Sequence, residues 1–525
     1  MDDSATGNKG NFLALVHLLA KYDLVLCEHL TKVKLQKKVC VSYLSPEIQN
    51  EFINCLGNHV RKKILAEVKE AKYFTIVFDS TPDLSHKDQT MMESFSDFLE
   101  TEGKKAEDIS KMILDKIESN GLDMRRQAYD NAAVGNTFWC TNPYQGNPNA
   151  QYVACSNHNI NLVGVHAASV AVNSVTFFST MDRVFNYFLS STHRSKVLTD
   201  ITGQGVKRLI ETRWSARYEA IAIMKSHYTE IIEVLESLLQ NIKENAVTRS
   251  DAGLLLPALQ SLPFLAFLGL WNRVLCEIND TQLYLQTKGL NMHHCAMKIN
   301  ALQLFLVDNR DVMVNDALSY TKTTCEDLDI DIAPRRIKKT KKMTGEEAAN
   351  AGLGYDIKLR QEMYESVDRI TQEIKTRFHQ LHELDVKYSF LTPTNLLNPE
   401  YKCEFKEEPK RLRNLIAVAD TKDKYKIMKG SFELLEFIQQ CSYGISVPII
   451  VIMVRIFLTI ATSIAASERS FSKLKLIKNY LRSTMGSTRL SNLAIFSIEQ
   501  SITDEINFDD VINNFAAIKA IKVKL

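Results

Sequence analysis

The sequence predicts an α/β protein that is mainly helical, in which a mixed α/β unit is interrupted by a long helical block. Three observations carry this prediction. A short β-rich apolar run ends at Phe78, and a second strand pattern ends at Cys155. Between about residues 218 and 322 the apolar spacing is helical almost throughout, and helical patterns return from Arg411. The chain has 525 residues, 45% of them hydrophobic, which is enough for several domains with buried cores.

The first 70 residues predict helices. Phe12, Leu15 and Leu19 have the spacing of one buried helical face. Ser45 followed by Pro46 is typical of an N-cap with proline at the first helical position. We therefore expect a second helical stretch to begin at Pro46.

The segment from residue 71 to 172 is predicted to mix strands and helices. Its first strand ends at a polar turn that begins with Asp79, as a buried central strand does. The expected elements are a strand at Tyr73–Phe78, a turn at 79–89, a strand at Glu93–Phe98, a helix around 109–117, a strand at Gln151–Cys155 and a helix from His158 to about Val172.

Changes in composition predict the domain organisation. An acidic block followed by a strongly basic one, at about residues 326–354, is typical of a solvated and mobile linker. The predicted parts are a helical N-terminal region (1–70), the first part of an α/β core (71–215), a helical insertion that contains the linker (216–440) and a C-terminal region that completes the core (441–525).

Charge, cysteine usage and apolar runs exclude several classes of protein. The net charge is +2, so any nucleic-acid contact needs a local basic patch. The ten Cys lack a paired framework, which is typical of reduced thiols in the cytosol or nucleus. The apolar run Leu254–Leu270 contains Pro257 and Pro263. The run Val447–Ala466 contains Arg455, which is costly in lipid. Both runs therefore predict buried helices, and no membrane partner is expected.

Four groups of short motifs stand in a fixed order over most of the chain. They are Phe78–Ser85; Tyr129–Ala133; Cys155–Leu162 with Thr212–Ser215; and Ala465–Ser472 with Leu490–Ala494. Together they resemble the transposases of the hAT superfamily, especially those grouped with the MYM-type zinc-finger proteins. The resemblance implies an RNase H-like catalytic core that is split by a helical insertion.

The resemblance also implies a catalytic triad of carboxylates: Asp79, Asp130 and Glu468. In the family these residues hold two Mg²⁺ or Mn²⁺ ions. Two hard cations stabilise the attacking and leaving oxygens of an in-line attack on phosphorus, and they prefer oxygen ligands. The alternative is structural: each Asp is a turn or cap residue, and Glu468 belongs to a surface ion-pair network with Arg469.

Two further pairs of residues are candidates for binding. Arg213 and Trp214 match the family's Arg-Trp motif, which implies contact with DNA; the alternative is that the indole belongs to the core. Cys155 and His158 have C-x-x-H spacing, but no second pair stands at suitable spacing. Structural zinc sites use four ligands, so we expect a structural pair there.

Two departures from the family predict a degenerate or domesticated protein. No Cys/His cluster precedes Phe12, where family members carry a zinc finger. Only about 26 residues separate Asp79 from the helix expected near Ala106, which predicts that the second strand of the RNase H-like sheet is missing near Thr90. We therefore expect an incomplete core with little or no DNA strand transfer.

The C-terminal region shows no such departure, and the resemblance places the family's dimerisation region there. The apolar run from Val447 continues at helical spacing through Leu481 and is flanked by charges, which suits contact between subunits. We therefore expect self-association through residues of about 440–500. The residues expected to carry self-association are Phe471, Leu474, Ile477, Leu481, Leu490 and Leu493. The alternative is that they pack inside the chain and cover the sheet.

Taken together, the sequence predicts a degenerate or domesticated hAT transposase-like protein that self-associates and contacts DNA weakly. Its expected location is the nucleus, with the cytoplasm as the alternative. Two other functions stay open: an active metal-dependent DNA transposase, and a helical scaffold that acts only through protein contacts. Nuclease activity with Mn²⁺ would distinguish an active transposase from the other two functions. Salt-dependent DNA binding would distinguish the degenerate transposase-like protein from the helical scaffold.

Overall fold

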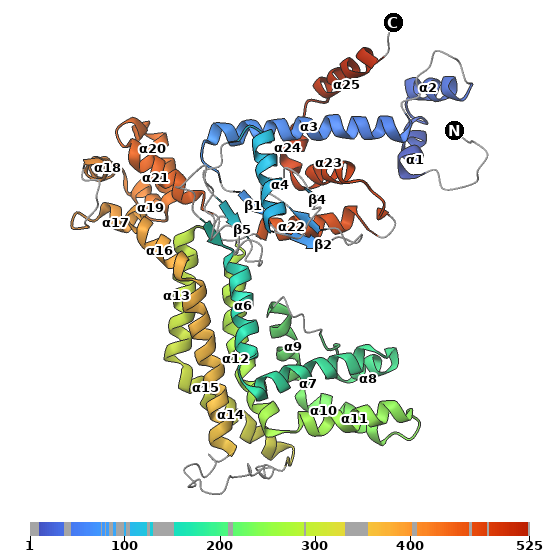
Figure 1. The fold of residues 1–525 in the computed structure, drawn as a ribbon, viewed down its shortest axis with the longest axis vertical. Helices are drawn as coiled ribbons and strands as arrows, with labels where there is room; N and C mark the ends of the chain where they lie inside the picture. The colour runs from blue at the N-terminus through green and yellow to red at the C-terminus, as the bar shows by residue number, and fades with distance from the viewer. Residues whose placement is uncertain are drawn as a thin grey trace. The chain divides into compact units, whose positions relative to one another are not determined.

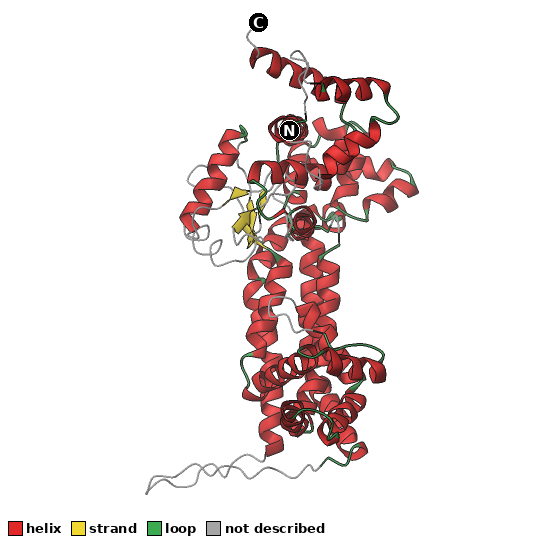
Figure 2. Cartoon of the chain, turned by 90° about the vertical axis from the view of Figure 1, so that its right-hand side faces the viewer, coloured by secondary structure: helices red, strands yellow, loops and turns green. Residues whose placement is uncertain are grey.

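The computed structural model describes residues 10–35, 44–74, 76–78, 80–82, 88–90, 99–100, 106–122, 127–129, 152–207, 214–287, 290–330, 355–401, 407–460, 465–479 and 482–522 (Figure 1). These residues are mostly helical, with a few short strands (Figure 2). The mainly helical character predicted from the sequence is therefore confirmed. The chain divides into two compact units.

Unit 1 joins both ends of the chain: it comprises Met1–Lys72, Val77–Asp123 and Ala466–Leu525. Its helices are α1 (Gly10–Leu19), α2 (Leu24–Lys34), α3 (Pro46–Ala71), α4 (Ala106–Ser119), α22 (Ala465–Ile477), α23 (Ser487–Ile498), α24 (Gln500–Asp504) and α25 (Phe508–Lys522). Helix α3 begins as predicted, because the Ile48 N–H donates to the Ser45 side chain at 3.3 Å and Pro46 follows.

A three-stranded antiparallel sheet in unit 1 corrects two expectations. It contains β2 (Ser80–Pro82), β3 (Asp88–Thr90) and β4 (Leu99–Glu100) in that order, with Thr90 opposite both Ser80 and Leu99. A turn over 79–89 and a missing strand near Thr90 were therefore wrong expectations. The reason is strand length: these strands have two or three residues, whereas the prediction assumed about five or six. The strand expected at Glu93–Phe98 lies outside the described residues.

The core of unit 1 forms where the C-terminal helices pack on α3. Its buried residues are Val60, Ile64, Phe471, Leu474, Leu490, Ala494, Ile495, Ile506 and Val511. Gly57 of α3 lies against the buried Asn492 of α23, which leaves no room for a Cβ at this position. Asn492 in turn donates to the Asn54 side chain at 3.1 Å.

Unit 2 comprises Tyr73–Ile76 and Met124–Ala465. Strands β5 (Gln127–Tyr129) and β6 (Tyr152–Ala154) belong to this unit and are parallel. The sheet order is β1, β5, β6, and β1 (Ile76–Phe78) is divided, with Ile76 in unit 2 and Val77 and Phe78 in unit 1. The helices of unit 2 are α6 (Ser156–Ala168), α7 (Val172–Leu189), α8 (Thr192–Thr202), α9 (Trp214–Ser226), α10 (Tyr228–Gln240), α11 (Ala246–Leu259), α12 (Leu262–Leu285), α13 (Met292–Asp308), α14 (Arg310–Asp327), α15 (Tyr355–Arg377), α16 (His379–Tyr388), η1 (Ser389–Leu391), α17 (Pro393–Leu397), α18 (Glu407–Val418), α19 (Thr421–Ile427), α20 (Ser431–Gln440), η2 (Tyr443–Ile445) and α21 (Pro448–Leu458).

The predicted elements of unit 2 are found with shifted ends. The strands expected to end at Phe78 and Cys155 are confirmed as β1 and β6, although each is shorter than predicted. Helix α14 continues to Asp327, and the Ile330 N–H donates to the Cys325 carbonyl at 2.9 Å, so the expected linker does not begin at 326. Residues 331–354, where most of that linker falls, lie outside the described residues. The four-part domain division stays a prediction.

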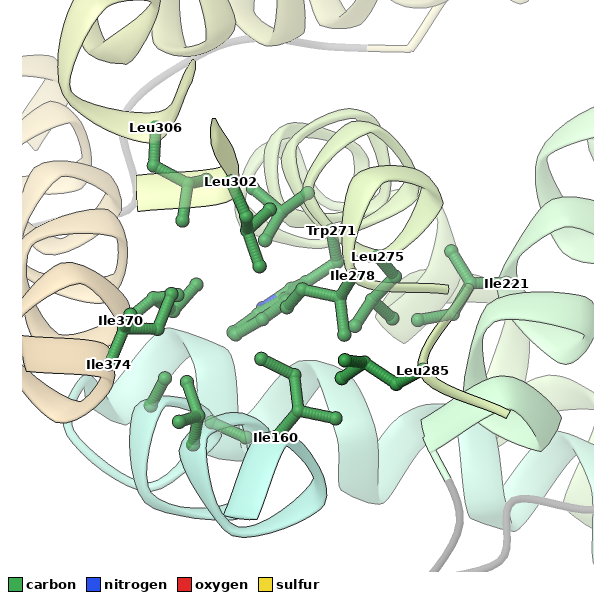
Figure 3. Packing of buried hydrophobic residues seen from close by; sticks show 14 of the residues in the cluster. Ile160, Ile221, Trp271, Leu275, Ile278, Leu285, Leu302, Leu306, Ile370 and Ile374 are labelled. Carbon is green, nitrogen blue, oxygen red and sulfur yellow. The ribbon is translucent and has the colours of Figure 1, made fainter. Parts of the chain in front are cut away.

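The core of unit 2 surrounds Trp271 of α12, which is fully buried. Figure 3 shows its indole among Ile160 of α6, Leu302 of α13 and Ile370 of α15. The indole N–H donates to the Ser174 hydroxyl of α7 at 3.2 Å, so the one polar atom of this side chain has a partner. These contacts join five helices around one residue.

The two apolar runs that resemble membrane spans are divided in the structure. Leu254–Leu270 is broken between α11 and α12, and the run from Val447 belongs to α21 and then α22. Within the described residues, no single helix is long and apolar enough to cross a bilayer; two bent pairs of consecutive helices meet the length and composition requirement only jointly.

Candidate catalytic and self-association sites

The expected catalytic carboxylates are only partly described. Asp79 follows the last residue of β1, and Asp130 follows the last residue of β5, but both lie outside the described residues. Glu468 lies in helix α22, and its side chain is also outside the described set. The triad therefore stays a prediction. Two of its members, Asp79 and Asp130, directly follow β1 and β5 in the sequence, and these strands are neighbours in the sheet order.

Among the described residues, no group of three His, Cys, Asp or Glu side chains could hold a metal ion. Cys155 is buried and directly precedes α6, which contains His158 in its first turn. This pair thus lies at the junction of β6 and α6, where a structural role was expected.

The side chains expected to contact nucleic acid lie outside the described set. Arg213 lies outside the described residues, and Trp214 is the first residue of α9, with a side chain outside the described set. Contact between these two residues and DNA stays a prediction.

Most of the residues expected to carry self-association pack against other side chains of the same chain. Phe471, Leu474 and Leu490 are buried in the core of unit 1, and Ile477 packs against it. Leu493 is half-buried on α23, and Leu481 lies outside the described residues. These apolar residues therefore pack α22 and α23 against α3. Contact with a second copy would need other side chains.

Exposed apolar side chains lie on η2 and α21, within the stretch of about 440–500 through which self-association was expected, although these residues were not among those named for it. Ile445 is 93% exposed, and Ile449 and Ile452 are each 41% exposed. Ile449 and Ile452 stand three residues apart, so they share one face of α21. We call Ile445, Ile449 and Ile452 the isoleucine face. The signal was present in the sequence as Pro448 followed by isoleucines at helical spacing within an apolar run.

A buried carboxylate fixes the start of helix α21. The Ile449 N–H donates to Glu408 Oε1 at 3.2 Å, and the Ile450 N–H donates to Glu408 Oε2 at 2.9 Å. Glu408 is 8% exposed, and its negative charge also suits the positive end of the helix dipole. Because the first N–H groups of a helix have no intrahelical partner, this contact holds the isoleucine face in place.

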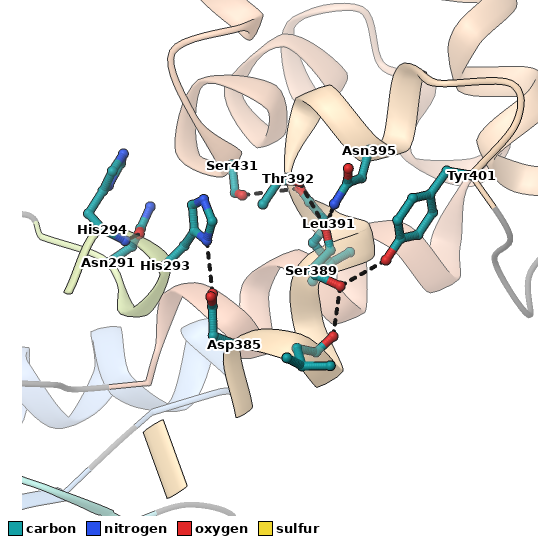
Figure 4. Close-up of polar contacts among 11 residues, drawn as sticks. Asn291, His293, His294, Asp385, Ser389, Leu391, Thr392, Asn395, Tyr401 and Ser431 are labelled. Carbon is teal, nitrogen blue, oxygen red and sulfur yellow. Dashed lines mark hydrogen bonds and ion pairs between the residues drawn. The ribbon is translucent and has the colours of Figure 1, made fainter. Parts of the chain in front are cut away.

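A polar network joins α13 and α16 near these helices (Figure 4). His293 Nδ1 lies 2.9 Å from Asp385 Oδ1. The hydrogen bond to Asp385 raises the pKa of His293 above its ordinary value, although burial acts against it. Burial lowers the pKa of the adjacent His294 and of His382. Asp385 therefore favours the charged form of His293, whereas burial favours the neutral forms of His294 and His382.

Asp385→Asn is expected to lower the pKa of His293, because the amide cannot stabilise the imidazolium as the carboxylate does. A raised folded-state pKa gives stability that is present below the unfolded value and is lost as pH rises through the folded value. The variant should therefore lose more stability at pH of about 5.5 than at about 8.5. NMR titration of His293 and urea unfolding at both pH values measure this. A His293 in the unaltered protein that titrates at or below its ordinary value would contradict the assignment.

Two stretches of the chain match known protein families. Residues 417–502 match the hAT family C-terminal dimerisation region. Residues 2–133 match the ZMYM1/FAM200, RNase-like domain. The first stretch contains the isoleucine face, and the second contains the positions of Asp79 and Asp130.

Two curated relatives are similar over most of the chain. The human protein named 52 kDa repressor of the inhibitor of the protein kinase is 20% identical over 513 residues, which cover 89% of this chain and 66% of the relative. The mouse protein of the same name is 20% identical over 521 residues, which cover 89% of this chain and 67% of the relative. The chain thus spans about two thirds of the length of these relatives.

Proposed function

We propose, from the premise that this chain is a hAT-derived, MYM-type-like protein, that it acts as a self-associating protein through its C-terminal region. The match of residues 417–502 to a dimerisation region is the observation that carries this proposal. The chain derives from a transposase, and its remaining role on this account is contact with a second copy of itself and weak contact with nucleic acid.

We assign the contact between copies to the isoleucine face. It lies inside the matched region, and its three side chains are exposed while Phe471 and Leu474 are buried within the chain. Burial of apolar surface is the dominant favourable term in most association. A stable interface buries about 1,000 Å² or more, so the isoleucine face would be the apolar centre of a larger contact.

The double variant Ile449→Asp/Ile452→Asp is expected to shift the protein from dimer to monomer. Each isoleucine is 41% exposed, so the burial that it can lose at the interface is about 1 kcal/mol, and each new carboxylate must also be desolvated there. Sedimentation equilibrium at tens of micromolar should show at least a hundredfold weaker dimer. Both positions already face solvent, so the fold of the monomer should survive.

Leu254→Asp is the matched control, because Leu254 is 60% exposed on α11 and lies outside the matched region. It should leave the dimer unchanged. A full chain that is monomeric at these concentrations would overturn the self-association. A dimer that resists both isoleucine substitutions would overturn the assignment to the isoleucine face alone.

We also propose that the short strands belong to an RNase H-like core. Such a sheet opens with three consecutive antiparallel strands, and β2, β3 and β4 are antiparallel neighbours. Strand β1 ends at Phe78 and β2 begins at Ser80, and β1 belongs to the sheet that continues with β5 and β6. The match of residues 2–133 to an RNase-like domain supports the same core. In this proposal the helices from α9 to α20 form the insertion.

The hairpin β2–β3 makes an active DNA transposase the second candidate function. In that case Asp79, Asp130 and Glu468 would hold Mg²⁺ or Mn²⁺, and the metal would supply charge stabilisation at phosphorus. On the first candidate function we expect no cleavage of DNA ends in Mn²⁺ by the full chain above an Asp79→Ala control. Robust cleavage that Asp79→Ala abolishes would replace the first candidate with the second.

We propose a nuclear location and keep Arg213 and Trp214 as the expected DNA contact. The derivation from a transposase supports the location, and so does the similarity to proteins that are named repressors. Imaging of a fluorescent fusion tests the location; exclusion from the nucleus would overturn it.

A further inference from the structure

A run of positive charge in unit 2 lies on α18 and α19, after the two glutamates that begin α18, and one of its cations, Lys426, pairs with Glu436 of α20 at 2.7 Å. From Lys410 to Gly430 the sequence contains seven Lys or Arg residues and two Asp residues. The whole chain, by comparison, has a net charge of +2. These 21 residues therefore form a positive patch on a nearly neutral protein, and a patch of this kind attracts acidic ligands.

A cavity of about 600 Å³ lies within this patch. It is lined by Leu397, Pro399, Lys410, Arg413, Asn414, Ile416, Ala417 and Lys424. None of these lining residues is acidic, and three carry a positive charge. The volume falls within the range of about 300–1,000 Å³ that is common for ligand sites.

Backbone carbonyls hold two of the three cations in place. Arg413 donates from Nη1 to the Asn398 carbonyl at 2.9 Å and from Nε to the Pro409 carbonyl at 3.3 Å. Lys424 donates to the Ala417 carbonyl at 2.9 Å. One donor of a lysine ammonium is used by such a contact, and two remain for a ligand. Neither cation is neutralised by these contacts, because a carbonyl carries no net charge.

The other half of the cavity lining is apolar. Leu397, Pro399 and Ile416 provide aliphatic surface beside the cations, and Ile416 is buried. The same two helices α18 and α19 also carry Val418, which is 83% exposed, and Tyr425, which is 71% exposed. A ligand that matches this lining has both an apolar group and negative charges.

We propose that this cavity binds a short acidic peptide segment of a partner protein, with one apolar side chain on the aliphatic half and carboxylates facing Lys410 and Lys424. Charge complementarity fixes the sign of the ligand, and the aliphatic half selects a peptide over a nucleic-acid strand. The phosphates of a nucleic acid would also use the cations, but its bases stack best on aromatic side chains, and none lines this cavity. This site goes beyond self-association, because it binds a different ligand and only part of it is shared with the matched dimerisation region: Lys410, Arg413 and Ile416 lie before that region, and Ala417 and Lys424 lie inside it.

The test is the binding of a fluorescein-labelled peptide, about ten residues long, in which Asp and Glu flank two Leu residues. Fluorescence anisotropy with the full chain should show saturable binding that weakens as salt rises. Lys410→Gln/Lys424→Gln should weaken it by several-fold, up to about 25-fold, if each exposed ion pair contributes up to about fivefold. A peptide with Leu replaced by Ala should also bind more weakly, by fivefold or more.

Lys358→Gln/Lys375→Gln is the matched control, since both lysines are exposed on α15 and the change in charge is the same. It should alter the affinity by less than twofold. Three outcomes would overturn the proposal. The first is that the peptide shows no saturable binding. The second is that the Lys410/Lys424 double variant binds it as tightly as the unaltered protein does. The third is that the peptide without Leu binds with unchanged affinity and single-stranded DNA of equal charge displaces it. The last outcome would assign the cavity to nucleic acid. Sedimentation of the Lys410/Lys424 variant should show an unchanged dimer, so failure here is distinguishable from failure of self-association.

Discussion

Replacement of Trp271 by alanine is expected to lower the free energy of unfolding by about 3–5 kcal/mol, the range observed for Phe or Trp to Ala changes in cores. The indole is fully buried and contacts side chains from α6, α13 and α15, so no single helix can move to fill the space. The Ser174 hydroxyl would also lose its hydrogen-bond donor. Urea unfolding, followed by circular dichroism, measures the loss.

Trp271→Phe is the graded control for this substitution. A phenyl ring keeps most of the apolar volume and removes the N–H, so we expect a loss of about 1–3 kcal/mol. A Trp271→Ala variant that unfolds within about 1 kcal/mol of the unaltered protein would show that Trp271 does not organise the core of unit 2.

Gly57→Ala is expected to destabilise the packing of α3 against α23, by about 1–3 kcal/mol. A Cβ at this position would lie 2.7 Å from Asn492 Cγ and 3.1 Å from Asn492 Cβ, so rotation of the terminal amide alone cannot relieve the overlap. Asn492 is also buried and tied to Asn54, which limits its movement. Helix propensity acts in the opposite direction, by up to about 1 kcal/mol.

Gly253→Ala gives the opposite sign with the same chemical change. Gly253 also lies inside a helix, α11, and a Cβ there would meet only Leu239 at 3.4 Å, an ordinary contact. We expect a gain of about 0.4–1 kcal/mol. Thermal unfolding of both variants checks the pair: a stabilised Gly57→Ala protein would contradict the close approach of α3 and α23.

The sequence predicted those elements whose cause is local. The start of α3 followed from Ser45 and Pro46, whose cap geometry needs no distant contact. Strands β1 and β6 followed from short apolar runs. The hairpin β2–β3 could not be predicted, because strands of three residues are stabilised by pairing with each other and carry no repeated pattern of their own.

The candidate sites were also predicted only in part, because they depend on contacts between distant parts of the chain. Phe471, Leu474 and Leu490 were identified as apolar and regularly spaced, but spacing alone does not say whether the partner is α3 or another copy. Residues 417–502 contain both kinds of apolar face, and only the burial of each side chain separates them. The basic residues of α18 and α19 were not singled out from the sequence, and the cavity depends in addition on Leu397 and Pro399, from α17 and the turn after it.

Photo-crosslinking from position 452 tests the central claim most directly, namely that two copies meet at the isoleucine face. Benzoylphenylalanine in place of Ile452 should, on irradiation of the full chain, give a covalent dimer whose crosslinked peptides fall within residues 417–502 of both copies. The same group in place of Leu254 should give none. A dimer by sedimentation that yields no crosslink from position 452, or one that crosslinks equally from position 254, would contradict the account.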